Sequence, residues 1–481
     1  MQATDEQPRP RRVVIPPGLV AFAGVVAVTG VVVAALGLAA VWDEAINAWS
    51  LGAYWAAAAL GWLVLTTMWR VLDGRERAGL GRRGGRDFAK AATIVLLLAA
   101  GARVAVALSG PPVLSDDLWR YVHDGATLGL AGENPYAQSP AETDPDFLGN
   151  HPEMVTIYQP VSQWVFAGLA AVAWQTPGAT ADTLFRLGFS MLDLMVVGLL
   201  MAALWRRGRS AWWASLYAWH PLAITEVAGA GHQEPLGIAL LLTGMLLADA
   251  VGDNLRGVRR LAGATGCGGA VAAAVAVKPV VAPIAIFIAC RWWRRGGGTS
   301  SASVIALAGM AGGAVLVAAY LPFALMPGGL DRMFETVATF TQNWRFNGSL
   351  HPLLEAVTGS KAVSDGVLGL ALLAAVGAIA WRVRDAWQAA GAYLLVALLL
   401  TSTVHPWYVL WPLALVPLSR GAGVWVFSLT ATWAYAAWLN DSAFQPPMWL
   451  RVLEYVPVYA AAAWSLWYTR YGGNRSTPAL R

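Results

Sequence analysis

The sequence predicts an all-α polytopic membrane protein, and three observations carry that prediction. Only 13% of the 481 residues are charged, 57% are hydrophobic, and the mean hydropathy is +0.53. A soluble chain would carry about 25% charged residues. Apolar runs of about 20 residues, each long enough to cross a bilayer, recur along the chain. The two cysteines, Cys267 and Cys290, lie in such runs, so we expect neither a disulfide framework nor a zinc site.

We predict a bundle of about 13–14 transmembrane helices. In chain order they cover residues 18–41, 50–71, 91–108, 183–205, 211–228, 235–251, 262–277, 279–290, 301–323, 365–382, 389–404, 407–419, 422–438 and 449–469. The arginine-rich start is typical of a signal peptide, but no clear cleavage site follows it, so we expect the first helix to be retained. The segments 262–277 and 279–290 are short. They form either a tight hairpin around Lys278-Pro279 or one broken helix.

The distribution of charge predicts the topology, because lysine and arginine resist translocation. With the N-terminus inside, most of the 33 lysine and arginine residues fall on inner loops and inner helix ends. Most of the 28 acidic residues then fall outside or within the membrane. Both termini are therefore expected in the cytoplasm. If the apolar segment 158–174 crossed the membrane, every later basic loop would fall on the outer side. We therefore interpret this segment as a helix lying in the outer interface.

Two long outer loops define the predicted organisation. They cover about 109–182 and 324–364, and long loops with internal order are usually functional. We expect an N-terminal tail, two transmembrane helices and a basic inner loop over 1–90, and a membrane module with both long outer loops over 91–420. The last part, 421–481, is expected to hold the C-terminal helices and a cytoplasmic tail.

The first outer loop opens with a polar cluster. Asp116 and Asp117 come directly after an apolar segment, and Arg120 and Tyr121 follow on the next helical turn. Carboxylates beside a membrane are costly unless they are solvated, paired or functional. One of the pair can act as general base toward a hydroxyl while the other orients substrate or a cation. The alternative is a solvated pair that caps a helix, since Ser-Asp-Asp suits an N-cap.

Two further polar groups lie near predicted helix ends on the outer side. His232 and Glu234 are in a short Gly-His-Gln-Glu segment. This segment could bind a sugar or the second substrate. The alternative is a solvated loop tip. Lys278 is isolated in an apolar stretch. It either meets a lipid phosphate at the outer interface or extends to the surface along its apolar stem.

The second outer loop combines arginine with aromatic and amide side chains. Arg345 lies between Trp344 and Asn347, and a guanidinium matches phosphate in bidentate fashion. The alternative is a loop that anchors the protein at the interface. His405 and Tyr408 lie at another outer helix end, where Tyr is expected as an interface anchor.

The chain resembles the GT-C glycosyltransferases, which are polytopic enzymes that use lipid-linked sugar donors. The pattern Ser-Asp-Asp-x-x-Arg-Tyr at 115–121, then Asp124-Gly125 and Asn134-Pro135-Tyr136, looks like the first outer loop of the polyprenol-phosphate-mannose-dependent mannosyltransferases. The resemblance covers roughly 91–411 and its specific part is the acidic loop. An extra pair of helices before that loop departs from the simplest layout of the family.

The resemblance implies a GT-C-like bundle in which Asp116 or Asp117 is the catalytic base. A sugar, mannose by resemblance, would pass from polyprenyl phosphate to a hydroxyl of a glycan, glycolipid or protein acceptor, with inversion. The residues implied to bind the donor phosphate are Lys278, Arg345 and Arg120. Those implied to contact substrate are Tyr121, His232, Glu234, Trp344, Asn347, His405 and Tyr408.

Other classes of function receive less support. The sequence has no Walker loop, Rossmann fingerprint or HExxH motif, so we expect no nucleotide chemistry on the inner face and no nucleic-acid partner. No cofactor is assigned, and a divalent cation at Asp116 and Asp117 is left open. The alternative function is a lipid or sugar transporter or flippase, and an aspartate within a predicted helix, Asp193, is consistent with it. A non-catalytic membrane scaffold is the third hypothesis. Composition favours a bacterial plasma membrane, with the active site outside the cytoplasm.

Overall fold

The computed structural model describes residues 18–19, 21–26, 28–30, 32, 48–77, 79, 84–112, 114–253, 256–439 and 444–471. The N-terminal tail, much of the predicted helix 18–41 and the C-terminal tail lie outside the described residues. Within the described part, every regular element is a helix, apart from isolated bridges that join Phe346 and Asn347 to Thr403. The predicted all-α class is therefore confirmed.

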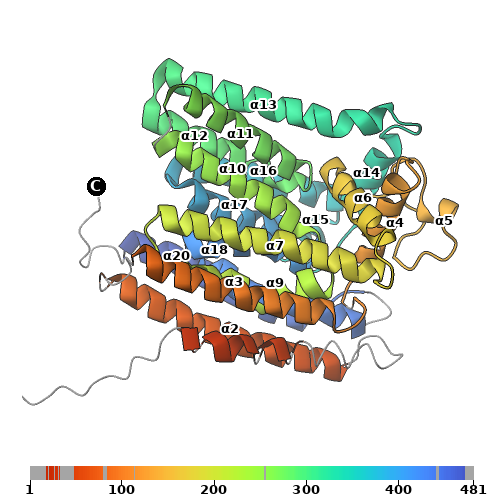
Figure 1. Cartoon of the computed structure of the whole chain (residues 1–481), viewed down its shortest axis with the longest axis horizontal. Helices are drawn as coiled ribbons and strands as arrows, with labels where there is room; N and C mark the ends of the chain where they lie inside the picture. The colour runs from red at the N-terminus through yellow and green to blue at the C-terminus, as the bar shows by residue number, and fades with distance from the viewer. Residues whose placement is uncertain are drawn as a thin grey trace, which may run out of the picture.

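Six of the described helices are long and apolar enough to cross a membrane, so the chain is a multi-pass membrane protein. They are α2 (Ala48–Arg77), α3 (Gly85–Ala107), α7 (Ala181–Arg206), α10 (Glu234–Asp253), α13 (Gly298–Leu325) and α16 (Lys361–Arg382). In Figure 1 the long helices run side by side across the view, with α13 along one edge of the bundle and α2 along the other.

Other helices occupy most of the remaining predicted spans. They are α11 (Gly257–Val275), η3 (Pro279–Val281), α12 (Ile284–Gly296), α17 (Ala386–Leu400), η4 (Pro406–Val409), α18 (Leu410–Ser419), α19 (Ala422–Thr430), η5 (Ala431–Leu439) and α20 (Met448–Tyr471). Arg260 near the start of α11 donates to Ser300, just past the end of α12, at 2.7 Å. The chain therefore reverses direction between α11 and α12, which selects the hairpin at Lys278-Pro279.

The prediction of one helix over 211–228 is wrong. This stretch is divided into η1 (Ala211–Ala214), α8 (Ser215–Ala218), α9 (Pro221–Ile224) and the π-helical turn η2 (Thr225–Gly229). The break falls at His220, whose backbone is extended (φ −68°, ψ 129°) because the following proline disfavours the helical conformation. The whole stretch is buried, as irregular backbone at membrane depth must be.

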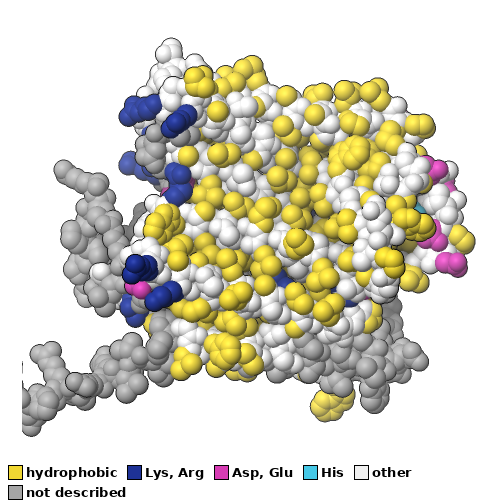
Figure 2. Space-filling model, viewed as in Figure 1, with side chains coloured by type: hydrophobic (Ala, Val, Ile, Leu, Met, Phe, Trp, Pro, Cys, Tyr) yellow, Lys and Arg dark blue, Asp and Glu magenta, His cyan; other side chains and the backbone are white. Residues whose placement is uncertain are grey.

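The two ends of the bundle carry opposite charge. Lysine and arginine side chains gather at one end and aspartate and glutamate at the other, with a hydrophobic band between them (Figure 2). We call these ends the basic face and the acidic face. The acidic face is built by α4 (Asp117–Gly129), α5 (Pro140–Thr143), α6 (Pro160–Trp174), α14 (Asp331–Asn343) and α15 (Leu350–Thr358).

Both predicted outer loops meet on the acidic face. The side-chain amide of Asn134 donates to the Gly329 carbonyl at 2.8 Å, and Arg332 pairs with Glu142 at 2.8 Å. The predicted interfacial segment is α6, which packs against α4 at this face (Figure 1). Residues more than 180 positions apart are thus held together at one end of the bundle.

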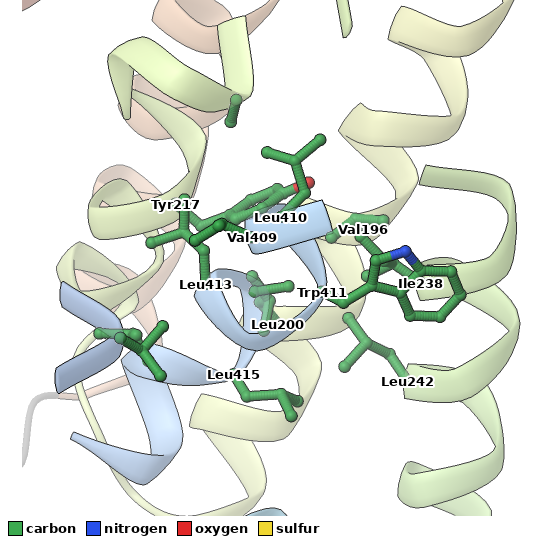
Figure 3. Close-up of a cluster of buried hydrophobic side chains, with 14 of the residues drawn as sticks. Val196, Leu200, Tyr217, Ile238, Leu242, Val409, Leu410, Trp411, Leu413 and Leu415 are labelled. Carbon is green, nitrogen blue, oxygen red and sulfur yellow. The ribbon is translucent and has the colours of Figure 1, made fainter. Parts of the chain in front are cut away.

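The centre of the bundle is an apolar core around α18. Figure 3 shows Trp411 and Leu413 of α18 among side chains of α7 and α10, including Leu200 and Leu242. Trp411 and Leu413 are almost completely buried. Because η4 leads directly into α18, this packing fixes the base of the segment that carries His405 and Tyr408.

One ion pair lies fully buried among the helices. Arg103 of α3 donates through Nε to Asp193 of α7 at 2.6 Å, and its Nη1 donates to the Ala218 carbonyl at 2.8 Å. The Tyr217 hydroxyl donates to the second Asp193 oxygen at 2.5 Å. Asp193 therefore joins α3, α7 and α8. This structural role explains a buried aspartate in the bundle, and no transport pathway is needed to account for it.

Candidate active site

Asp117 is the first residue of α4 and faces inward on the acidic face. Its backbone N–H donates to the Ser115 hydroxyl at 3.2 Å, which fixes the start of the helix. Its side chain is 21% exposed and interacts with the Tyr158 hydroxyl through a hydrogen bond. Burial, with the neighbouring charge of Asp116, raises the pKa of the Asp117 carboxyl to about 7. A carboxylate with such a pKa is suited to accept a proton near neutral pH.

Glycines allow α4 to approach α6 closely. A Cβ atom added at Gly125 would lie 2.4 Å from the Phe166 carbonyl oxygen, and one at Gly129 would lie 2.5 Å from that of Ala167. Tyr121, on the same helix, is fully buried and stacks on the Phe166 ring at 4.7 Å. Tyr121 therefore packs α4 in place, and with Tyr158 it forms the wall behind Asp117.

His232 lies beside Asp117, although 115 positions separate the two in the sequence. The distance from His232 Nδ1 to Asp117 Oδ2 is 3.9 Å. The imidazole is completely buried and stacks on Trp407 with ring centroids 3.9 Å apart. Trp407 stacks in turn on His405, and His405 on Phe346, each pair with centroids 4.4 Å apart. A column of four rings thus joins His232 to the second outer loop.

Lys278 is adjacent to the same site. Its ammonium nitrogen lies 2.7 Å from a Glu234 carboxylate oxygen and 3.7 Å from the centroid of the Tyr408 ring. The lysine side chain is 25% exposed, so it is only partly enclosed. Its charge lowers the pKa of Asp117, against the larger effect of burial, which places both groups in one electrostatic environment. The structure therefore brings together Asp117, His232, Glu234, Lys278 and Tyr408.

A family model for the N-terminal domain of alpha-(1->6)-mannopyranosyltransferases matches residues 17–294. The match covers more than half of the chain and includes α4, His232 and Lys278. The chain belongs to this family. It is a membrane mannosyltransferase of the GT-C class, as its resemblance predicted, and hence a hexosyltransferase. No curated protein sequence gives a significant match.

Asp116 of this mannosyltransferase has surroundings unlike those of Asp117. Its carboxylate accepts a hydrogen bond from the Asn150 side chain at 2.7 Å, and burial raises its pKa. Arg120 holds the same loop, since its guanidinium donates to the backbone carbonyls of Asn150, His151 and Met154 at 2.8 to 3.1 Å. The donors of Arg120 are thus directed at the loop and away from Asp117.

The second outer loop is held by its own contacts. Arg345 of the mannosyltransferase forms a bidentate pair with Glu355, with the shortest separation 2.7 Å. Asn347 is buried with φ +51°, and its amide donates to Glu454 at 3.0 Å. Trp344 packs against His151 of the first loop, with centroids 4.6 Å apart. These residues join the two loops to each other and to α20, and they do not reach the group around Asp117.

Among the described residues there is no group of three or more His, Cys, Asp or Glu side chains that could hold a metal ion. The mannosyltransferase has a groove of about 370 Å³ beside the site, between α14, α16 and α17. Its lining is mostly apolar and includes Leu368, Gly369 and Leu372 of α16. Tyr408, whose ring contacts Lys278, also lines this groove, so the groove and the polar site share a wall.

Sequence reasoning overlooked several of these residues. Tyr158, Trp407 and Glu226 are not among the predicted site residues, yet all three contribute to the surroundings of Asp117 or His232. The only local signal was the position of Glu226 six residues before His232, in a stretch with few charges.

Proposed function

We propose that the protein transfers mannose from a polyprenyl-phosphate donor to a sugar hydroxyl at the acidic face, with Asp117 as general base. The single observation that carries the proposal is the proximity of a base, a cation and an apolar groove. Asp117 supplies the base, Lys278 the cation, and the groove ends against the Tyr408 ring that Lys278 contacts. A lipid-linked sugar phosphate requires all three.

The groove suits the lipid part of the donor. Its lining by Leu368, Leu372 and Leu400 offers apolar contact to a polyprenyl chain, and burial of apolar surface stabilises by about 25 cal/mol per Å². A chain bound there brings its phosphate to Lys278. The ammonium group then stabilises the negative charge that develops on the leaving phosphate.

Asp117 accepts the proton of the attacking hydroxyl. The hydroxyl oxygen forms a bond to the anomeric carbon while the bond from that carbon to the phosphate oxygen breaks, so the configuration inverts. The alpha-(1->6) linkage in the family's description supports a 6-hydroxyl of a sugar as the acceptor group. Inversion then requires a β-linked donor. Asp116, held by Asn150 at the mouth of the site, orients the acceptor.

The charge distribution supports the orientation of the site in the cell. Basic ends of membrane helices tend to remain in the cytoplasm, which supports an orientation with the basic face inside and the acidic face outside (Figure 2). The composition supports a bacterial plasma membrane. The lipid-linked donor and the acceptor glycan or glycolipid then meet on the extracytoplasmic side.

The test is transfer of labelled mannose from polyprenyl-phosphate mannose in vesicles that carry the protein. Asp117→Asn should lower the rate by about 10²–10⁴-fold, the usual contribution of a positioned base, without loss of folded protein. Asp116→Asn is the matched comparison and should retain measurable transfer. Wild-type rates in Asp117→Asn would refute the assignment of the base.

A second experiment addresses the groove. Gly369 lines the groove, and a Cβ there meets no atom within 4 Å, so Gly369→Phe introduces a ring at an open position of the groove wall. The KM for a long-chain donor should rise, while a donor with a short lipid should be affected less. Gly377→Phe, at an equally open position on α16 outside the groove, is the control. Equal effects of both variants on both donors would contradict the assignment.

A further inference from the structure

A second carboxylate lies behind His232, on the side away from Asp117. Glu226 belongs to the π-helical turn η2 and has no exposed surface. Its two oxygens share one bifurcated hydrogen bond from the Tyr435 hydroxyl, at 2.7 and 2.8 Å. A buried carboxylate is costly, and π-helical turns within helices are frequent at functional sites.

His232 lies between the two carboxylates. Its Nε2 is 3.5 Å from Glu226 Oε2, and its Nδ1 is 3.9 Å from Asp117 Oδ2. Neither ring nitrogen has a hydrogen-bond partner among the described residues. Both separations exceed a direct hydrogen bond, as is common for catalytic contacts before a substrate closes the site. Two buried ring nitrogens without hydrogen-bond partners therefore face two carboxylates. We call Asp117, His232 and Glu226 the array, and this arrangement indicates a functional role for it.

The ring cannot easily turn away from this array. Its face is held against Trp407, which stacks on His405 on its other side. The charged or titratable groups around it are Asp117, Glu226, Lys278 and His405. Burial, and next the positive charge of Lys278, lower the pKa of His232 well below its ordinary value. The imidazole is therefore neutral and has one N–H, so its tautomer decides which nitrogen can accept a hydrogen bond.

We propose that Glu226 is a positioning residue for the transfer reaction: its carboxylate accepts the Nε2–H of His232 and so directs the Nδ1 lone pair at Asp117. A carboxylate behind an imidazole fixes tautomer and orientation in this way. The inference rests on the proposed role of Asp117 as base. After Asp117 has taken the proton of the acceptor hydroxyl, its new O–H donates to Nδ1. The proton is thereby turned away from the new glycosidic oxygen until it leaves to water after product release.

The experiment measures kcat and KM of the full-length protein in vesicles. Glu226→Gln presents an amide N–H to Nε2 and so favours the opposite tautomer. We expect kcat to fall on the order of 10²-fold, with the KM for the donor unchanged, because Glu226 does not contact substrate. Glu226→Asp, which keeps the carboxyl group, should recover part of the loss. Glu454→Gln is the matched control, since Glu454 is equally buried but bonded to Asn347, and its kcat should equal that of the wild type.

A double variant separates positioning from general damage. If Glu226 acts only through the imidazole, Glu226→Gln combined with His232→Asn should lose no more activity than His232→Asn alone. Losses that multiply, or a wild-type kcat in Glu226→Gln, would overturn the inference. If Glu226→Gln does not fold, Tyr435→Phe releases Glu226 from its bifurcated hydrogen bond and should lower kcat at constant KM. An unchanged kcat in that variant would overturn the inference as well.

The failure of this inference is distinguishable from that of the proposed function. An inactive Asp117→Asn together with a fully active Glu226→Gln would refute the positioning role and leave the base in place. A fully active Asp117→Asn would refute the base and, with it, everything that depends on it.

Discussion

Replacing Gly125 by alanine tests whether the packing of α4 against α6 sets the position of Asp117. The added Cβ would lie 2.4 Å from the Phe166 carbonyl oxygen, 2.8 Å from its carbonyl carbon and 3.2 Å from the Ala170 Cβ. An ordinary carbon–oxygen contact is about 3.3–3.6 Å. The backbone of α6 cannot yield as a flexible side chain would, so α4 must move away by about 1 Å.

This displacement has two measurable consequences. Overpacking of a close contact costs about 1–3 kcal/mol of stability. Asp117 opens the displaced helix, and a misplacement of about 1 Å can lower a rate by 10²-fold. We therefore expect Gly125→Ala to lose about two orders of magnitude in kcat while the folded protein remains the major species.

The assay is mannose transfer in vesicles, combined with thermal unfolding of the purified protein in detergent. Gly168→Ala on α6 is the control, because a Cβ there meets no atom within 4 Å. It should leave kcat unchanged and stability equal or slightly higher, since alanine is the better helix former. A wild-type kcat in Gly125→Ala would show that the approach of the two helices does not position the base.

Three further predictions concern charge. The transfer rate should rise with pH through an apparent pKa of about 7, because Asp117 must be deprotonated to act. The charge of Asp116 raises this pKa. In Asp116→Asn the rising limb of the pH–rate profile should therefore lie at lower pH. Arg103→Ala leaves Asp193 buried and uncompensated, which should cost about 3–5 kcal/mol in thermal or chemical unfolding, and no loss of stability would contradict a structural pair. Lys278→Gln removes a charge-assisted contact worth about 1.5–3 kcal/mol, which should raise the donor KM, whereas Lys278→Arg should keep much of the affinity.

The acidic loop was recognisable from the sequence because its signal is local. Asp116 and Asp117 are adjacent, follow an apolar segment and precede a helical turn with Arg120. A polar cluster beside a membrane needs a reason, so composition alone singles it out. The same argument found Lys278, the only lysine of its apolar region.

The contacts that each arginine makes within the protein were not recognisable in this way. Arg120 and Arg345 were expected at the donor phosphate, but one holds backbone carbonyls of the first outer loop and the other pairs with Glu355. An arginine has the same chemistry in either role. The two roles differ in which hydrogen-bond acceptor the fold brings within reach of the guanidinium. A short-range sequence pattern does not specify the distance between the guanidinium and that acceptor.

The sequence by itself determined the membrane class, the positions of the long helices and the separation of charge between two faces. These properties follow from hydropathy and from local composition, which act over one helix at a time. Only the tertiary structure decided which aspartate is enclosed, because Asp117 owes its surroundings to His232, Lys278 and Tyr158 from three other segments. The same is true of Glu226, which becomes part of the site only because the chain breaks at His220 and places η2 behind His232. Contacts between distant segments depend on how whole helices pack, and no residue pattern within a single segment specifies them.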